Sequence, residues 1–183
     1  MIAKTIQHKV SPLKYLVYQK HNKHCFRQEE CFLILSRNNQ SERAVMYCNP
    51  EEVYRKDMGW VQSLFISYLN TGENSGKGLG TMLLDIARQY SQEMGLGGRF
   101  HLEAGSLYNS EQVPHIFYRK YGMNTGRPSI DRKMDSFVRK RKKATNLDFK
   151  IMPMFYPPIE YDVKAKTSFF ENVKKRFLAY FNI

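Results

Sequence analysis

One short stretch of this sequence combines the residue types that bind phosphate groups. It holds three glycines, a lysine and two hydroxyls between a strand-like and a helix-like segment: Ser75, Gly76, Lys77, Gly78, Leu79, Gly80 and Thr81. A glycine-rich turn at the start of a helix leaves backbone N–H groups free, and the helix dipole adds partial positive charge. Side chains would keep a phosphate away from that backbone. These seven residues are therefore predicted to bind a pyrophosphate.

Two common nucleotide-binding loops do not fit this stretch. A P-loop would need glycine in place of Thr71 and a hydroxyl residue directly after Lys77, where Gly78 stands. A dinucleotide fingerprint beginning at Gly76 would need glycine in place of Thr81. The sequence excludes both.

A second group of reactive side chains follows the glycine-rich stretch. Tyr118, about 40 residues after Gly78, carries a phenol that is protonated at neutral pH. Glu103, at the end of a predicted strand, can accept a proton from an amine directly or through water. The alternative for Tyr118 is packing on a sheet, and for Glu103 a surface carboxylate. His101, His115 or no dedicated base at all stay open as alternatives to Glu103.

These two groups resemble motifs of the GNAT superfamily of N-acetyltransferases. The family loop R/Q-x-x-G-x-G/A is matched by Gly78-Leu79-Gly80, with Ser75 in place of the usual Arg or Gln. The family pattern F-Y-x-x-x-G-F is matched by the run from Phe117 to Met123. The resemblance covers residues 30–123. It implies acetyl-CoA as acetyl donor, no metal, and Tyr118 as the acid that protonates the departing thiolate.

The resemblance also implies a splayed pair of parallel strands that holds the pantetheine arm. A backbone N–H at a bulge near Tyr68–Asn70 would bind the oxyanion, so Tyr68 and Leu69 join the predicted cofactor site. An asparagine that often contacts the arm in the family is Glu111 here. Asn109, two residues earlier, is the remaining candidate for that contact.

Hydrophobic periodicity predicts the elements that must position these residues. Strands are expected at Cys31–Ser36, Arg43–Cys48, Gly59–Leu69 and Arg99–Glu103, with extended or mixed segments at 2–9, 13–19 and Phe149–Tyr156. A helix ending at Gly95 should bury Leu79, Met82, Leu83, Ile86, Tyr90 and Met94. Further helices are expected from Pro114 to near Gly122, as an exposed basic helix over 129–143, and from Ser168, where Glu171 completes a capping box.

This order gives an α/β class, and the resemblance refines it to a GNAT-like fold. That fold is a mixed, largely antiparallel sheet flanked by helices, with the splayed parallel pair holding CoA. Residues 1–156 are assigned to this domain, its cofactor core being 59–123, and residues 157–183 to a basic, amphipathic helical extension. With 183 residues, 42% of them hydrophobic, the chain is long enough for one well-packed domain.

Composition predicts a cytoplasmic protein. The sequence has no apolar run of about 20 residues that could span a bilayer and no cleavable signal, although specialised secretion stays open. Its three cysteines, without a CxxC pair, are expected to be reduced thiols. His21, His24 and Cys25 lack a second ligand pair, so a solvated turn is favoured over a metal site.

Positive charge is concentrated outside the predicted cofactor core. The net charge is +12 overall but −2 over residues 29–126, whereas residues 1–28 and 127–143 each carry +6. Basic flanks disfavour small cationic acceptors and favour an acidic macromolecule, either a protein or an aminoacyl-tRNA. The run 139–143 has the charge for phosphate contacts, or is a solvated helix face.

Two further hypotheses stay open. The protein could be a non-catalytic GNAT-like module that binds nucleic acid or an acidic protein. The apolar face of residues 168–181 could pack on the domain, on a second subunit in a homodimer, or on a membrane surface.

Overall fold

The computed structural model describes residues 15–22, 29–36, 42–72, 76–105, 113–145 and 147–161. In chain order the elements are β1 (Tyr15–Asn22), β2 (Glu29–Ser36), β3 (Glu42–Arg55), β4 (Gly59–Asn70), α1 (Leu79–Glu93), β5 (Phe100–Ala104), α2 (His115–Tyr121), α3 (Pro128–Arg139) and β6 (Met152–Tyr156). The expected segment 2–9 and the expected helix from Ser168 lie outside the described residues. No helix in the described part of the chain is long and apolar enough to cross a bilayer.

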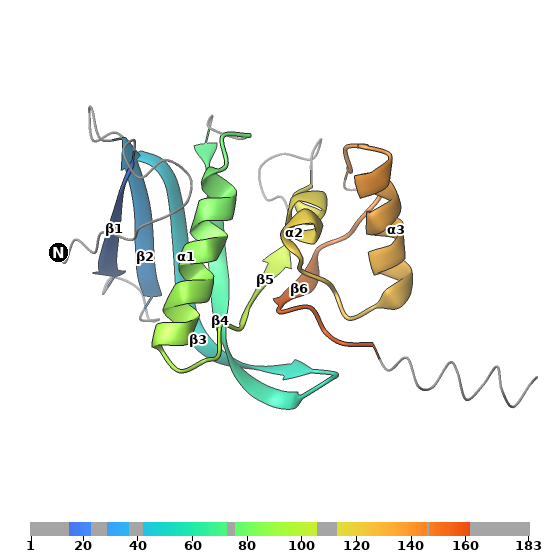
Figure 1. Ribbon diagram of the computed structural model, residues 1–183, viewed down its shortest axis with the longest axis horizontal. Coiled ribbons are helices and arrows are strands. Elements are labelled where there is room, and N and C mark those ends of the chain that lie inside the picture. Colours follow the sequence, from blue (N-terminus) through green and yellow to red (C-terminus); the bar gives the residue numbers. More distant parts are fainter. Residues whose placement is uncertain are drawn as a thin grey trace, which may run out of the picture.

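The six strands form one mixed sheet in the order β1-β2-β3-β4-β5-β6 (Figure 1). Every neighbouring pair is antiparallel except β4 and β5, which are parallel. A parallel pair needs a long crossover, and α1 supplies it, since it lies between these two strands in the chain. In the chain, helices α2 and α3 lie between β5 and β6. This mixed α/β arrangement confirms the expected fold class.

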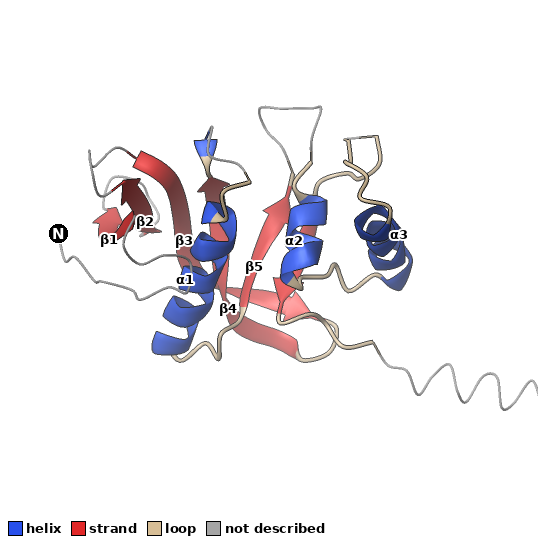
Figure 2. Ribbon diagram, turned by 45° about the horizontal axis from the view of Figure 1, so that its top comes forward, coloured by secondary structure: helices blue, strands red, loops and turns tan. Residues whose placement is uncertain are grey.

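One face of the sheet packs against α1 and α2 (Figure 2). Strand alternation places Phe32, Met46 and Leu64 on that face, and all three are buried. Phe32 contacts Tyr90 of α1 edge to face, and Phe100 of β5 contacts Tyr121 of α2.

The predicted stripe on α1 is largely confirmed, except that Tyr90 is only half-buried and Met94 is exposed. Leu79, Met82, Leu83 and Ile86 are buried as expected, together with Leu84, Ala87 and Ser91. Met94 is exposed, because the helix ends at Glu93 and Met94 is already its C-cap residue. Gly95 follows with a φ of 75° and donates its N–H to the Gln92 carbonyl, which terminates the helix as predicted.

Strand β3 is longer than the sequence predicted. It continues past Cys48 to Arg55 although Pro50 lies within it. The pairing with β2 reaches only to Glu30 and Cys48, so Pro50 lies where that edge of β3 has no partner strand. Because no strand pairs with that edge, the N–H that Pro50 lacks is not needed for a hydrogen bond between strands. Residues 51–55 and 59–63 form a two-stranded ribbon that extends beyond the main sheet (Figure 1).

Two other boundaries differ from those expected. The first described strand covers residues 15–22 rather than 13–19. Helix α3 covers Pro128–Arg139, so the expected helix over 129–143 was too long at its C-terminal end. Arg141 has a φ of 51°, a left-handed conformation that no helix interior accommodates.

Candidate functional site

Strands β4 and β5 diverge at their C-terminal ends. Their parallel pairing covers only three positions and stops at Ile66 and Leu102. Strand β4 nevertheless continues to Asn70, and β5 continues to Ala104. On the facing edges beyond Ile66 and Leu102, β4 and β5 are therefore no longer strand partners of each other, although both lie in the middle of the sheet.

A bulge in β4 lies beside this divergence. Cys48 pairs with Ile66 but Tyr47 pairs with Tyr68, so Ser67 is the extra residue. The bulge thus consists of Ser67 and Tyr68, at the start of the region near Tyr68–Asn70 where it was expected. The Ser67 hydroxyl donates to the Tyr47 carbonyl oxygen at 3.4 Å, which is consistent with both residues lying opposite Tyr47.

The bulge changes which N–H groups of β4 are directed toward β5. The Leu64 N–H donates to the Arg99 carbonyl oxygen on that side. Successive N–H groups of a strand alternate between its two edges, and a bulge directs two consecutive ones to the same edge. Leu69 is thus the first residue beyond the bulge whose N–H is directed into the opening between the strands.

The start of α1 has the geometry of an anion site. Gly78 is the N-cap residue with a φ of 82°, and Gly76 has a φ of 83°. A methyl group built on either glycine would meet no atom within 4 Å, so the space in front of them is open. The Met82 N–H donates to the Gly78 carbonyl, which is the first bond of the helix. Within the described residues no side chain caps the preceding N–H groups.

The other loop residues differ in their surroundings. Lys77 is exposed and Thr81 is half-buried, whereas Leu79 is buried in the core. Tyr68 is half-buried, contacts the ring of Tyr47, and accepts a hydrogen bond from the Asn70 amide at 2.9 Å. Ser75 and Asn109 lie outside the described residues.

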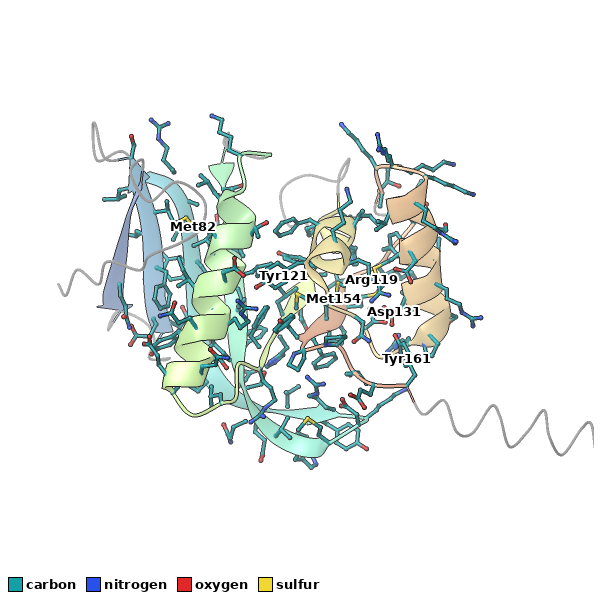
Figure 3. All side chains as sticks on the ribbon, viewed as in Figure 1. Met82, Arg119, Tyr121, Asp131, Met154 and Tyr161 are labelled. Atoms are coloured by element: carbon teal, nitrogen blue, oxygen red, sulfur yellow. The ribbon has the colours of Figure 1, made fainter. Side chains whose placement is uncertain are left out.

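The structure brings the two sequence motifs together through Gly80. A Cβ built on Gly80 would lie 2.9 Å from Cζ of Phe117, the residue before Tyr118. The first turn of α1 therefore packs directly on α2, and Gly80 has a packing reason for lacking a side chain. A second contact joins the same helices, because the Tyr121 hydroxyl donates to Asp85 at 2.7 Å (Figure 3). Sequence patterns gave no indication of that bond.

Tyr118 is buried in the core beneath this contact. Burial raises the pKa of its phenol to about 12, so the side chain is protonated throughout the neutral range. Its ring lies 5.2 Å from that of Phe117. In the described part of the chain, no group hydrogen-bonds to its hydroxyl, in contrast to Tyr121 three residues later.

Glu103 lies at the mouth of the opening between the strands. It follows Leu102, the last residue of β5 that pairs with β4, and is exposed. Strand alternation directs it to the face opposite Leu102, and hence opposite α1 and α2. Tyr118 and Glu103 therefore approach the divergence of β4 and β5 from opposite faces of the sheet.

His101 belongs to a polar network on the same face as Glu103. Its Nε2 lies 3.0 Å from the Glu51 carboxylate and its Nδ1 lies 3.0 Å from the Ser63 hydroxyl. A carboxylate only accepts, so Nε2 carries the proton and Nδ1 accepts from Ser63. Burial lowers the pKa of His101, although Glu51 opposes that effect. No sequence spacing pointed to Glu51, because it meets His101 only through the β3–β4 ribbon.

Basic residues follow α3 beside the start of α2. Residues 139–143 are all exposed, and the next residue, Ala144, accepts a hydrogen bond from the Val113 N–H at 3.1 Å. Arg141 terminates α3 in a left-handed conformation, with its N–H donating to the Val138 carbonyl. Glycine is the usual residue at such a position. The described residues contain no cluster of three or more potential metal ligands.

No family model and no curated protein matches the sequence. Among solved structures, a bacterial toxin is similar over 69% of this chain and 66% of its own, at 13% identity and a TM-score of 0.47. A KacTA–DNA complex matches over 82% and 77%, at 14% identity and a TM-score of 0.46. A mutant AtaT toxin bound to the C-terminus of the antitoxin AtaR and acetyl-CoA is similar over 52% of this chain and 59% of its own. Its sequence identity is 14% and its TM-score is 0.39.

The chain thus spans less than two thirds of the length of the bacterial toxin and of the AtaT toxin. Similarity at this level assigns no family to the chain.

Proposed function

We propose that this protein transfers an acetyl group from acetyl-CoA to a primary amine on an acidic macromolecule. The observation that carries the proposal is the divergence of β4 and β5 after Ile66 and Leu102, beside the uncapped start of α1. A slot between strands suits a long, thin arm, and free N–H groups at a helix start suit the pyrophosphate joined to it. CoA has both parts.

Two sets of residues would hold the cofactor. The N–H groups of Gly76 to Thr81 would bind the pyrophosphate, with Lys77 and Ser75 adding side-chain contacts. The backbone of Tyr68 and Leu69 would line the pantetheine arm, and Asn109 would contact it from the loop before α2. Bound in this way, acetyl-CoA supplies an activated acetyl thioester.

The chain's own groups would then perform three tasks. The Leu69 N–H would stabilise negative charge on the carbonyl oxygen while the C–N bond forms. Glu103 would accept the proton that the amine loses, directly or through water. Tyr118 would donate its proton to the sulfur as the C–S bond breaks, and solvent would restore it.

The high pKa of Tyr118 is compatible with this role. Burial also raises the pKa of the Cys48 thiol, because an apolar environment disfavours any anion. An apolar environment would raise the pKa of the CoA thiol beside Tyr118 for the same reason. The pKa values of the proton donor and of the group that accepts the proton are therefore shifted in the same direction.

Charge supports a macromolecular acceptor, either an acidic protein or an aminoacyl-tRNA. The exposed run 139–143 is anchored next to the start of α2 by the Val113–Ala144 hydrogen bond. It carries five positive charges and no acid. Arg141 has a left-handed backbone conformation in which glycine would be less strained. A positively charged side chain at this strained position supports a role of its charge in binding.

Calorimetric titration with acetyl-CoA tests the proposal. Gly78→Glu places a carboxylate in front of the free N–H groups and should abolish micromolar binding. Gly95→Glu is the matched control: it lies at the other end of α1, has a similar φ of 75°, and has equally open surroundings. Wild-type protein that fails to bind at millimolar acetyl-CoA would refute the proposal. Binding without thiol release for any amine acceptor would favour the non-catalytic module.

A further inference from the structure

Three large apolar side chains gather at the end of the β3–β4 ribbon. Tyr54, Met58 and Trp60 are 55%, 52% and 67% exposed, and the rings of Tyr54 and Trp60 pair across the strands at 5.7 Å. We call these residues the ribbon-tip patch. It lies at the start of β4, whereas the proposed acetyl-transfer site lies at the other end of that strand. A cluster of this kind usually marks a contact surface.

The end of the described chain is fastened to this same ribbon. Arg55, whose carboxylate partner is Asp57 at 2.8 Å, donates to the Pro157 carbonyl oxygen at 2.9 Å. The Glu160 N–H donates to Asp57 at 3.3 Å, within the turn that joins β3 to β4. Figure 1 shows the end of the described chain near the tip of the ribbon. Since neighbouring residues of a strand face opposite ways, Arg55 holds the chain on the face of the ribbon opposite Tyr54 and Trp60, and residues 162–183 start from there.

The sequence of this last segment fits an apolar surface. Its apolar side chains recur at helical spacing at Phe169, Phe170, Val173, Phe177, Leu178 and Phe181. The six residues 162–167 can span up to about 20 Å when extended, which is enough to pass from Asp57 to either face of the ribbon. Residues 164–176 carry a net charge of +4 and residues 51–57 of the ribbon a net charge of −1, with both Glu52 and Lys56 exposed.

We propose that residues 168–181 dock through their apolar side chains on the ribbon-tip patch of the same chain. The proposal rests on the position of Glu160, the exposure of the patch and the pattern of the segment. It is independent of the acetyl-transfer proposal, because neither the patch nor the segment contains a residue of that site.

Trp60 is the single tryptophan of the chain and reports directly on the patch. In full-length protein we expect a blue-shifted emission and an acrylamide quenching constant about two-fold below that of a chain whose Trp60 is uncovered. Phe170→Asp/Phe177→Asp should shift the emission to the red and restore the quenching. Asn172→Asp/Asn182→Asp, which adds the same two carboxylates outside the apolar set, should change neither.

Three results would overturn the proposal. One is wild-type Trp60 that is quenched as freely as a model indole. Another is identical quenching in the two double variants, with circular dichroism and a thermal melt verifying that both are folded. A third is protection that disappears on dilution, which would assign the contact to a second copy of the chain. Protection that is independent of concentration supports docking within one chain.

Discussion

At the scale of single residues, two tyrosines of α2 meet contrasting surroundings. The hydroxyl of Tyr121 donates to Asp85, and burial together with that bond raises its pKa. The hydroxyl of Tyr118 has no hydrogen-bond partner in the described part of the chain, and burial alone raises its pKa to about 12. The bond of Tyr121 stabilises the contact between the helices, whereas the proposed role of Tyr118 is to donate a proton.

Substitution of these two residues should separate chemistry from stability. Tyr118→Phe should lower kcat by about 100-fold or more, since it removes the proton donor, and should leave the Kd for acetyl-CoA unchanged. Tyr121→Phe should keep kcat within a small factor but lower the free energy of unfolding by about 1 kcal/mol, because Asp85 loses a donor. Thiol-release kinetics and urea unfolding measure the two effects. Equal loss of kcat in both variants would contradict the role given to Tyr118.

His101 should make stability depend on pH. Burial lowers its pKa below the ordinary 6.5 in the folded state, so the unfolded chain binds the proton more readily. The contribution of His101 to the free energy of unfolding is fully present above the pKa that the residue has in the unfolded chain. It is lost as pH falls through the pKa that the residue has in the folded protein. We expect the free energy of unfolding to fall between about pH 7 and about pH 5, and to fall less in His101→Gln. Part of the decrease should remain, because burial lowers the pKa of His115 as well. Identical pH profiles would exclude the assignment.

At the scale of elements, the junction of α1 and α2 depends on close approach at Gly80. Gly80→Ala should cost about 1–3 kcal/mol of unfolding free energy, because its Cβ would press on the ring of Phe117. Phe117→Leu should recover part of that loss when the two substitutions are combined. Thermal melts of the two single variants and the double variant measure the coupling. If the losses of unfolding free energy in the two single variants simply add in the double variant, Gly80 and Phe117 are not in close contact.

The N-terminal end of α3 is held by a buried carboxylate. Asp131 accepts bonds from the N–H and the hydroxyl of Thr125 and from the Tyr161 hydroxyl (Figure 3). Asp131→Asn should lower the free energy of unfolding by about 2 kcal/mol, since an amide replaces one accepting oxygen. Asp148 accepts the same two bonds from Thr145 at the surface, so Asp148→Asn is a matched control with a smaller expected loss. Equal losses in urea would argue against the importance of burial.

At the scale of the whole molecule, positive charge is separated from the proposed cofactor core. Replacement of residues 139–143 by glutamine should weaken binding of a polyanion and reduce its salt dependence, by about 0.9 in the log–log slope for each lost phosphate contact. The Kd for acetyl-CoA should change little, since the start of α1 is untouched. Binding assays with a short RNA and an acidic polypeptide over a salt series measure the effect. An unchanged slope for both would identify the run as a solvated surface.

Local patterns were sufficient to predict most of the elements. The stripe from Leu79 to Ile86 and the stop at Gly95 depend on interactions within a few residues, so the sequence determined them. The α/β order was predicted for the same reason, whereas the roles of Gly78 and Tyr118 came from the resemblance to a family and stay predictions. Boundaries were wrong where a long-range partner decides the outcome. Thus β3 continues through Pro50 only because β2 no longer pairs there.

The tertiary structure alone decided how these parts meet. The pairing of β4 with β5 ends at Leu102, the bulge lies at Ser67, and Gly80 touches Phe117. Each of these features joins segments that are far apart in the sequence, so it depends on strand register and side-chain packing rather than on local preference. The sequence determined which reactive residue types the chain has, and the register of the sheet decided which of them lie near one another.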